Sequence, residues 1–248
     1  MKLLRVNRTI LIHFIVLAAI GQVTAQTRLS VNETTLEEAN QRTTEISTND
    51  LKKILASKSG TVLDVRSAIE YSIAHIPGSV NIYEKELDRV AQLFPDKTTH
   101  LVFYCNGPYC GKSKRLSEQL LQLGYTNIRR YQLGLPMWRA LGNTVQTDAE
   151  GFRYVFAKDK TAVFVDARSA SEFQKETVPG AVNIHPGEAE KANEDGRLPY
   201  RDKGTRVIVF ANTLAEAQRV AEEIAKKAYW SSSYFSGSFA DLKNIRLW

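Results

Sequence analysis

Cysteine is scarce in this sequence, with two residues among 248. That number excludes a small scaffold stapled by disulfides and a structural zinc site with four thiolates. Beyond residue 25 no apolar run approaches the ~20 residues that a membrane-spanning helix needs. The apolar fraction of 43% and the charged fraction of 24% are those of a globular chain, which excludes wholesale disorder, collagen and coiled coil. The length fits one large domain or two small ones.

Acidic residues are absent from the first 25 positions, which contain three basic ones: Lys2, Arg5 and Arg8. An apolar run of twelve positions, Ile10 to Gly21, follows them, and small residues stand at Val23 and Ala25. A basic start, a short apolar middle and a small-residue end are typical of a secretory signal. We predict that residues 1–25 are a signal peptide cleaved after Ala25, which leaves a periplasmic or secreted protein without a stable membrane span. An uncleaved anchor is the alternative.

The formal net charge of +6 falls to +3 without those three basic residues. Half of the apparent basicity therefore belongs to the export signal. The rest is too weak and too dispersed to indicate a nucleic-acid partner, and none is predicted.

The chain contains one unit written twice. Leu63–Tyr71 recurs as Val165–Phe173, and Ile76–Ile82 recurs as Val178–Ile184. The offset is 102 throughout, and ten of the twenty paired positions from 63 to 82 are identical. This is a duplication of domain size rather than a solenoid repeat.

The duplication divides the chain after the signal peptide into three parts. Residues 26–44 are a polar N-terminal extension, residues 45–142 form the first domain, and residues 147–248 form the second. The polar stretch around 143–148 is expected to join the two domains.

Short apolar runs alternate with helical patterns in both units, which is typical of a parallel sheet flanked by helices. The expected strands are Thr61–Val65, Val80–Ile82, Leu101–Tyr104, Ile128–Tyr131, Val163–Val165 and Val207–Phe210. Leu116, Leu120 and Leu123 recur at helical spacing, and a second helix is expected over 214–228. We therefore predict an α/β protein of two domains, each a small parallel sheet flanked by helices.

Cys105 directly follows the expected strand 101–104, and a Gly/Pro-containing loop leads from it into a helix. Open α/β sheets bind ligands outside the carboxyl ends of their strands. The helix N-terminus and the loop amides are expected to lower the pKa of the Cys105 thiol and hold it as a nucleophilic thiolate. Gly107 and Gly111 allow backbone amides to approach an anion. Three cations follow on the helix: Lys112, Lys114 and Arg115.

Four pieces in this order carry a resemblance to a known family: Asp64–Arg66 with Glu70–Tyr71, His75–Ile82, the loop Cys105–Gly111, and Gly134–Trp138. Together they resemble the rhodanese (thiosulfate sulfurtransferase) family in its tandem form. The resemblance implies that Cys105 takes a sulfane sulfur from a small anionic donor such as thiosulfate, becomes a persulfide, and passes the sulfur to a thiol or to cyanide. It implies no cofactor and no metal.

The candidate site follows from the loop and from this resemblance. Cys105 is the predicted catalytic residue. The predicted substrate-binding residues are Asn106, Gly107, Pro108, Tyr109, Cys110, Gly111, Lys112 and Arg66. We expect structural roles for His75, beside a Pro-Gly turn, and for Trp138.

The second unit lacks the nucleophile. Ala211 stands where Cys105 stands in the first unit, and the following loop is expected to be about two residues shorter. We predict an active N-terminal domain and a degenerate C-terminal one, whereas the familiar tandem rhodaneses carry the cysteine in the C-terminal copy. The degenerate copy is free to bind a protein partner.

Two other functions are compatible with the sequence. Cys105 and Cys110 stand five residues apart, and a thiol–disulfide redox protein would use both. In that case Cys110 would form a disulfide with Cys105 or resolve a persulfide. Otherwise Cys110 merely lines the loop. A non-enzymatic binding or scaffold module is the other alternative.

Overall fold

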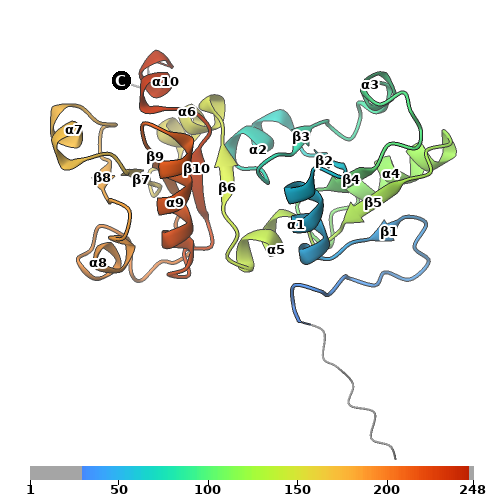
Figure 1. The fold of residues 1–248 in the computed structure, drawn as a ribbon, viewed down its shortest axis with the longest axis horizontal. Coiled ribbons are helices and arrows are strands. Elements are labelled where there is room, and N and C mark those ends of the chain that lie inside the picture. The colour runs from blue at the N-terminus through green and yellow to red at the C-terminus, as the bar shows by residue number, and fades with distance from the viewer. Residues whose placement is uncertain (1–29, 246–248) are drawn as a thin grey trace, which may run out of the picture.

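The computed structural model describes residues 30–245, which fold into two α/β domains that lie side by side (Figure 1). Each domain contains a five-stranded sheet in which all the strands run parallel. The predicted fold class is confirmed. The predicted signal peptide lies outside the described residues. Within residues 30–245, no helix is both long and apolar enough to cross a membrane.

The first sheet has the strand order β1-β5-β4-β2-β3. Its strands are β1 (Thr44–Glu45), β2 (Thr61–Asp64), β3 (Val80–Asn81), β4 (Leu101–Tyr104) and β5 (Ile128–Tyr131). The central strand β4 is apolar and every one of its residues is buried, as expected for a parallel sheet with helices on both faces. Its carboxyl end is where Cys105 leaves the sheet.

The second sheet repeats this arrangement with the order β6-β10-β9-β7-β8. Its strands are β6 (Val145–Thr147), β7 (Val163–Asp166), β8 (Val182–Asn183), β9 (Val207–Phe210) and β10 (Ser232–Phe235). The equivalence of the two orders is the structural expression of the sequence duplication.

Helices cover both sheets. In the first domain they are α1 (Thr48–Ser57), α2 (Ala68–Ile73), α3 (Leu87–Leu93), α4 (Lys112–Gln122) and α5 (Gly134–Ala140). In the second they are α6 (Ala149–Lys158), α7 (Ala170–Lys175), α8 (Ala189–Glu194), α9 (Leu214–Ala225) and α10 (Phe239–Asn244). The duplicated motif places a capping box at the start of α2 and of α7, where a serine and a glutamate three residues later satisfy the free amides.

Three details differ from expectation. The stretch 143–148, expected to be a linker, carries strand β6 and so belongs to the second sheet. Helix α9 ends at Ala225, before residue 228. Leu123 lies just beyond the end of α4 and is largely exposed, so only Leu116 and Leu120 of the leucine series are buried.

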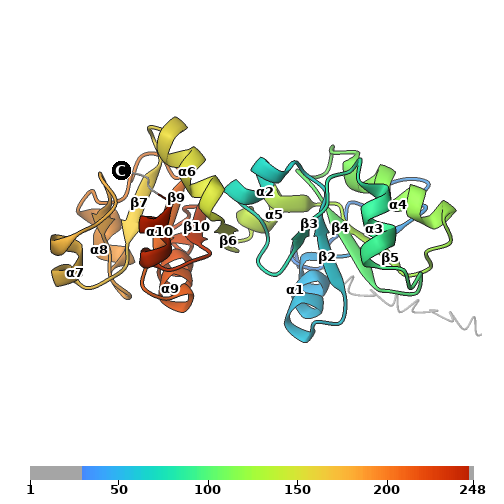
Figure 2. The same cartoon turned by 90° about the horizontal axis from the view of Figure 1, so that it is seen from above.

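The two domains pack through α2 and α6 (Figure 2). Gly151 on α6 lies so close to α2 that a Cβ there would fall 2.0 Å from the carbonyl oxygen of Ser72. The Gly151 amide donates to the Ser72 hydroxyl at 2.8 Å. His75 and Gln146 pair as a short antiparallel bridge, and Ile73 contributes to the apolar cores of both domains. The second domain is therefore held against the helix that follows the Asp64–Arg66 motif.

Candidate active site at the end of strand β4

Cys105 lies immediately after β4, and only 1% of its surface is exposed. Its Sγ donates to the carbonyl oxygen of Cys110 at 3.3 Å and lies 3.5 Å from the hydroxyl of Ser113. Ser113 belongs to the first turn of α4, so the helix N-terminus does face the sulfur, as the sequence predicted. The thiol is thus enclosed by the loop that it begins.

The predicted lowering of the Cys105 pKa is wrong. Burial raises the pKa of Cys105 to about 11, and the neighbouring side chain of Cys110 raises it further. The hydroxyl and backbone amide of Ser113 lower the pKa but do not overcome these effects. In an apolar site the thiolate is deprived of its hydration. The favourable interaction with the N-terminus of one helix compensates for only part of that loss. Cys105 is therefore protonated in the unliganded protein at neutral pH.

Gln132, just after β5, holds the loop in place. Its Nε2 donates to the carbonyl oxygens of Pro108 at 2.9 Å and of Cys110 at 3.3 Å. Its Oε1 accepts from the Ser113 hydroxyl at 3.3 Å and from the fully buried Arg130. One amide side chain thereby ties the second half of the loop and the first turn of α4 to the sheet. Sequence reasoning missed Gln132, since nothing in the sequence places it beside the loop.

Two glycines permit the close approach of the loop and helix α5. Gly107 and Gly134 adopt φ values of +100° and +64°. A Cβ at Gly134 would fall 2.4 Å from the amide nitrogen of Gly107 and 2.5 Å from the carbonyl oxygen of Cys105. That carbonyl accepts from the amide of Leu135 at 3.0 Å. The start of α5 therefore requires glycine.

Arg66 is buried and mostly engaged. Its guanidinium forms a two-pronged ion pair with Asp64 and also donates to the carbonyl oxygen of Ala74 at 2.6 Å. Nη1 faces Asn106 Oδ1 at 3.4 Å, and Asn106 Nδ2 in turn donates to Glu70 at 2.6 Å. The structure brings Arg66 to the loop, and most of its hydrogen-bonding capacity there serves the scaffold.

The cations that follow the loop are less available to an anion than the sequence suggested. Each has a carboxylate nearby: Lys112 lies 3.9 Å from Glu70, Lys114 lies 3.3 Å from Glu38, and Arg115 lies 2.6 Å from Glu84. These partners come from other elements, so the sequence shows the positive charges but not their neutralisation.

The remaining loop residues differ widely in exposure. Tyr109 projects fully into solvent, Gly107 is buried, and Pro108, Cys110 and Gly111 are half-buried. Both cysteines are free thiols. Of the predicted substrate-binding residues, Asn106–Gly111 form the loop that Cys105 begins, with Tyr109 pointing away from the protein body, whereas Lys112 starts α4 and Arg66 follows β2.

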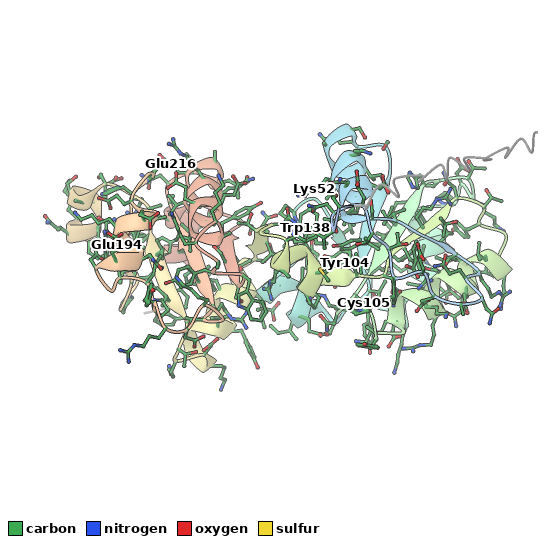
Figure 3. The ribbon with its side chains drawn as sticks, turned by 90° about the horizontal axis from the view of Figure 1, so that it is seen from below. Lys52, Tyr104, Cys105, Trp138, Glu194 and Glu216 are labelled. Carbon is green, nitrogen blue, oxygen red and sulfur yellow. The ribbon has the colours of Figure 1, made fainter. Side chains whose placement is uncertain are left out.

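Two residues expected to be structural are buried away from the thiol. The ring of His75 stacks on Tyr71, with 3.9 Å between centroids, and its Nδ1 lies 3.0 Å from the Tyr71 carbonyl oxygen. Trp138 donates from Nε1 to the carbonyl oxygen of Thr144 at 2.9 Å. Figure 3 shows Trp138 beside Lys52 near α1, with Cys105 beyond Tyr104.

A cavity of about 290 Å³ adjoins the loop at the boundary between the domains. Arg66 and Asn106 line it together with Arg139 on α5, and the second domain contributes Arg206 and Trp230. Arg139 and Arg206 were not predicted as site residues: nothing in the sequence marks Arg139 on α5 as facing a cavity, and only the packing of the two domains brings Arg206 to it.

A family model for the rhodanese-like domain matches residues 47–141 and again residues 155–245. The chain belongs to the rhodanese-like family. The predicted tandem arrangement is thereby confirmed: both domains are rhodanese-like.

Individual relatives each match part of this chain. A human thiosulfate:glutathione sulfurtransferase is 33% identical over 107 residues, which are 38% of this chain and 90% of the relative. An HTH-type transcriptional regulator of Mycobacterium tuberculosis is 37% identical over 90 residues, 36% of this chain. The crystal structure of a thiosulfate sulfurtransferase from Pseudomonas aeruginosa matches 79% of this chain at 19% identity, with a TM-score of 0.38. The chain spans 38% of the regulator and 41% of the Pseudomonas protein.

The second rhodanese-like domain retains the polar contacts that surround the site in the first domain, but it lacks the cysteine. Asp166 and Arg168 repeat the buried ion pair at 2.7 Å, and Asn212 donates to Glu172 at 2.7 Å as Asn106 does to Glu70. Ala211 is fully buried in place of Cys105.

The corresponding loop is four residues shorter, not two: seven residues separate β4 from α4, and three separate β9 from α9. Phe239 also covers the guanidinium of Arg168 at 3.3 Å. Its counterpart in the first domain is Leu135, since both amides donate to the carbonyl at the head of the loop, and there Arg66 lines a cavity instead.

Proposed function

We propose that this protein is a sulfurtransferase in which Cys105 of the first domain carries the sulfur. Membership of the rhodanese-like family and the resemblance of the first domain's motifs to thiosulfate sulfurtransferases support this activity. The observation that carries the proposal is the buried sulfur of Cys105 at the carboxyl end of β4, with the hydroxyl and amide of Ser113 directed at it.

The reaction proceeds in two displacements. The Cys105 thiol loses its proton and its sulfur attacks the outer sulfur of thiosulfate. An S–S bond forms to Cys105 while the S–S bond of thiosulfate breaks, so sulfite leaves with the bonding electron pair. Cyanide or a thiolate then attacks the outer sulfur of the persulfide, which releases thiocyanate or a new persulfide and restores Cys105. No external oxidant or reductant is needed.

The loop suits the persulfide better than it suits the thiolate. A persulfide carries its charge on the outer sulfur, one bond farther from the apolar core around β4, so its anion loses less hydration than a thiolate on Cys105 would. Because the pKa of the resting thiol is high, the thiolate is a small fraction of the unliganded protein at neutral pH. The residues proposed to line the donor site are those of the loop from Asn106 to Lys112, together with Arg66.

The test is thiocyanate formation from thiosulfate and cyanide by the purified protein. We expect turnover by the wild type and none above background by Cys105→Ala. The same variant should lack the cyanide-labile sulfur that the wild type acquires from thiosulfate. Thiocyanate formation that survives Cys105→Ala would overturn the assignment and also the proposal that the second domain is inactive.

The variant Cys110→Ser distinguishes sulfur transfer by Cys105 from the thiol–disulfide redox alternative. If Cys105 acts alone, this variant retains sulfur transfer. A thiol–disulfide oxidoreductase would lose its activity, because its disulfide needs both sulfurs.

We also propose that the protein is exported and that its second domain offers a surface to a protein partner. N-terminal sequencing of the native protein should begin at Gln26 if the signal peptide is cleaved as predicted. An N-terminus at Met1 in the mature protein would contradict cleavage.

A further inference from the structure

The cavity between the domains contains a positive charge that the described residues leave without a partner. Its walls include Arg66, Glu70, Asn106, Arg139, Arg206 and Trp230. The Nε of Arg139 is buried and has no hydrogen-bond partner among residues 30–245. Buried polar groups in proteins are otherwise nearly always paired, so this nitrogen requires an explanation.

The other two arginines of the cavity are neutralised. Asp64 holds Arg66 at 2.5 Å, and Asp159 holds the Nε of Arg206 at 3.2 Å. Glu70 is also on the wall, but its carboxylate already accepts from Ser67 at 2.7 Å and from Asn106 at 2.6 Å.

Without an acidic partner in the described part of the chain, the charged guanidinium of Arg139 is poorly stabilised in the unliganded protein. Burial lowers the pKa of Arg139 to about 10, and the neighbouring charges of Arg206 and Arg66 act in the same direction. An anion in the cavity would supply the missing charge and acceptor together. Planar guanidinium groups are well suited to bind oxyanions through two parallel hydrogen bonds.

We propose that the interdomain cavity is an oxyanion-binding site in which Arg139 is the principal ligand and the second domain closes the site with Arg206 and Trp230. The bound group is a carboxylate or a sulfur oxyanion. The cysteine-free domain then has a function in the first domain's site, because it supplies part of a wall next to Asn106. Binding of an oxyanion in this cavity does not depend on sulfur transfer. The interpretation that the cavity recognises the anionic part of a sulfur donor or acceptor beside Cys105 rests on the proposed function.

The experiment is a calorimetric titration of the full chain carrying Cys105→Ala, so that no persulfide forms. Two probes distinguish the sources of the oxyanion: thiosulfate as a free sulfur oxyanion, and S-methylglutathione as a larger sulfur compound that carries carboxylates. Ionic strength is held constant with potassium chloride. We expect saturable binding of at least one probe, with one site per chain.

Arg139→Gln should weaken that binding at least tenfold, and Arg206→Gln should weaken it by a smaller factor. The matched control is Arg153→Gln, which removes the same charge from an exposed position on α6. It should leave the affinity unchanged. Because Arg139→Gln removes an unpaired buried charge, its melting temperature should equal or exceed that of the parent.

Absence of saturable binding by both probes overturns the proposal, and so does undiminished affinity in Arg139→Gln. If that variant does not fold, Arg206→Gln and Trp230→Ala test the opposite wall, and unchanged affinity in both is the overturning result. Failure of thiocyanate formation by the wild type would count against the proposed sulfur transfer and leave these titrations unaffected.

Discussion

The side-chain amide of Gln132 donates at 3.3 Å to the carbonyl oxygen of Cys110, the same oxygen that accepts the thiol of Cys105. Gln132 is itself fixed by Arg130, which is fully buried and pairs with Glu38 at 2.9 Å. A continuous set of polar contacts thus runs from the N-terminal extension, through the sheet, to the Cys105 loop. This set fixes the position of the carbonyl oxygen to which the Cys105 thiol donates.

Replacement of Gln132 by glutamate should disturb the loop specifically. The new carboxylate still accepts from Arg130 and Ser113, but it faces the carbonyl oxygens of Pro108 and Cys110 with an oxygen in place of a donor. We expect thiocyanate turnover to fall on the order of 10- to 100-fold, as misplacement of a reacting group by about 1 Å does. The measurement is kcat with thiosulfate and cyanide.

The matched control is Gln119→Glu, which makes the same change at an exposed position on α4. It should retain wild-type turnover. Equal turnover in Gln132→Glu and in this control would show that the loop holds its shape without Gln132.

The raised pKa of Cys105 predicts its reactivity toward a neutral alkylating agent. Because burial keeps the thiol protonated up to about pH 11, the thiolate fraction should increase about tenfold per pH unit across the range accessible to experiment. The test is the rate of iodoacetamide labelling in Cys110→Ser, which leaves one thiol. A labelling rate that levels off below about pH 9 would contradict the raised pKa and support the thiolate that the sequence predicted.

Ser113 should increase the reactivity of Cys105, since its hydroxyl lies 3.5 Å from Sγ and lowers the pKa. Loss of one such hydrogen bond is worth about 0.5–1.5 kcal/mol, so Ser113→Ala should slow iodoacetamide labelling ~2- to 12-fold at fixed pH. Ser117→Ala is the control: that serine is equally buried but donates to the carbonyl oxygen of Ser113 at 2.6 Å. Equal rates in both variants would remove Ser113 from the proposed activation.

The architecture was predictable from sequence because the signals are local and occur twice. Local signals, namely the apolar runs and the capping boxes of Ser67 and Ser169, specify short-range structure. Because the unit recurs at an offset of 102 residues, the prediction for one copy can be checked against the other copy. An aspartate and an arginine also stand at matching positions in both units, and they form the buried ion pairs Asp64–Arg66 and Asp166–Arg168.

The electrostatics of the site were not predictable in the same way. The sequence shows the helix N-terminus beside Cys105 but not the depth of burial, and burial decides the direction of the pKa shift. It shows Lys114 but not Glu38, which lies 76 residues away in the chain and reaches it only after folding. Arg206 joins the candidate site through domain packing, which no local pattern records.

Gly134 offers a test of the contact between α5 and the loop. Gly134→Ala would place a methyl group 2.4 Å from the amide nitrogen of Gly107 at a residue with φ of +64°. Gly142→Ala is the matched control, because φ there is +78° but a Cβ would meet nothing within 4 Å. Both variants incur the cost of a left-handed backbone, about 1 kcal/mol, and only the first also incurs steric overlap of about 1–3 kcal/mol.

Urea unfolding should therefore show a larger loss of stability for Gly134→Ala than for Gly142→Ala, by that overlap energy. Thiocyanate turnover should fall in the first variant alone, since the displaced backbone includes the Cys105 carbonyl and Gly107. In the second domain the equivalent position is Ser238, the N-cap of α10, opposite a loop that is four residues shorter. Ser238 has a φ of −91°, an ordinary conformation for any residue, so a side chain is accommodated there. If both alanine variants lose the same stability, the longer loop does not impose the glycine.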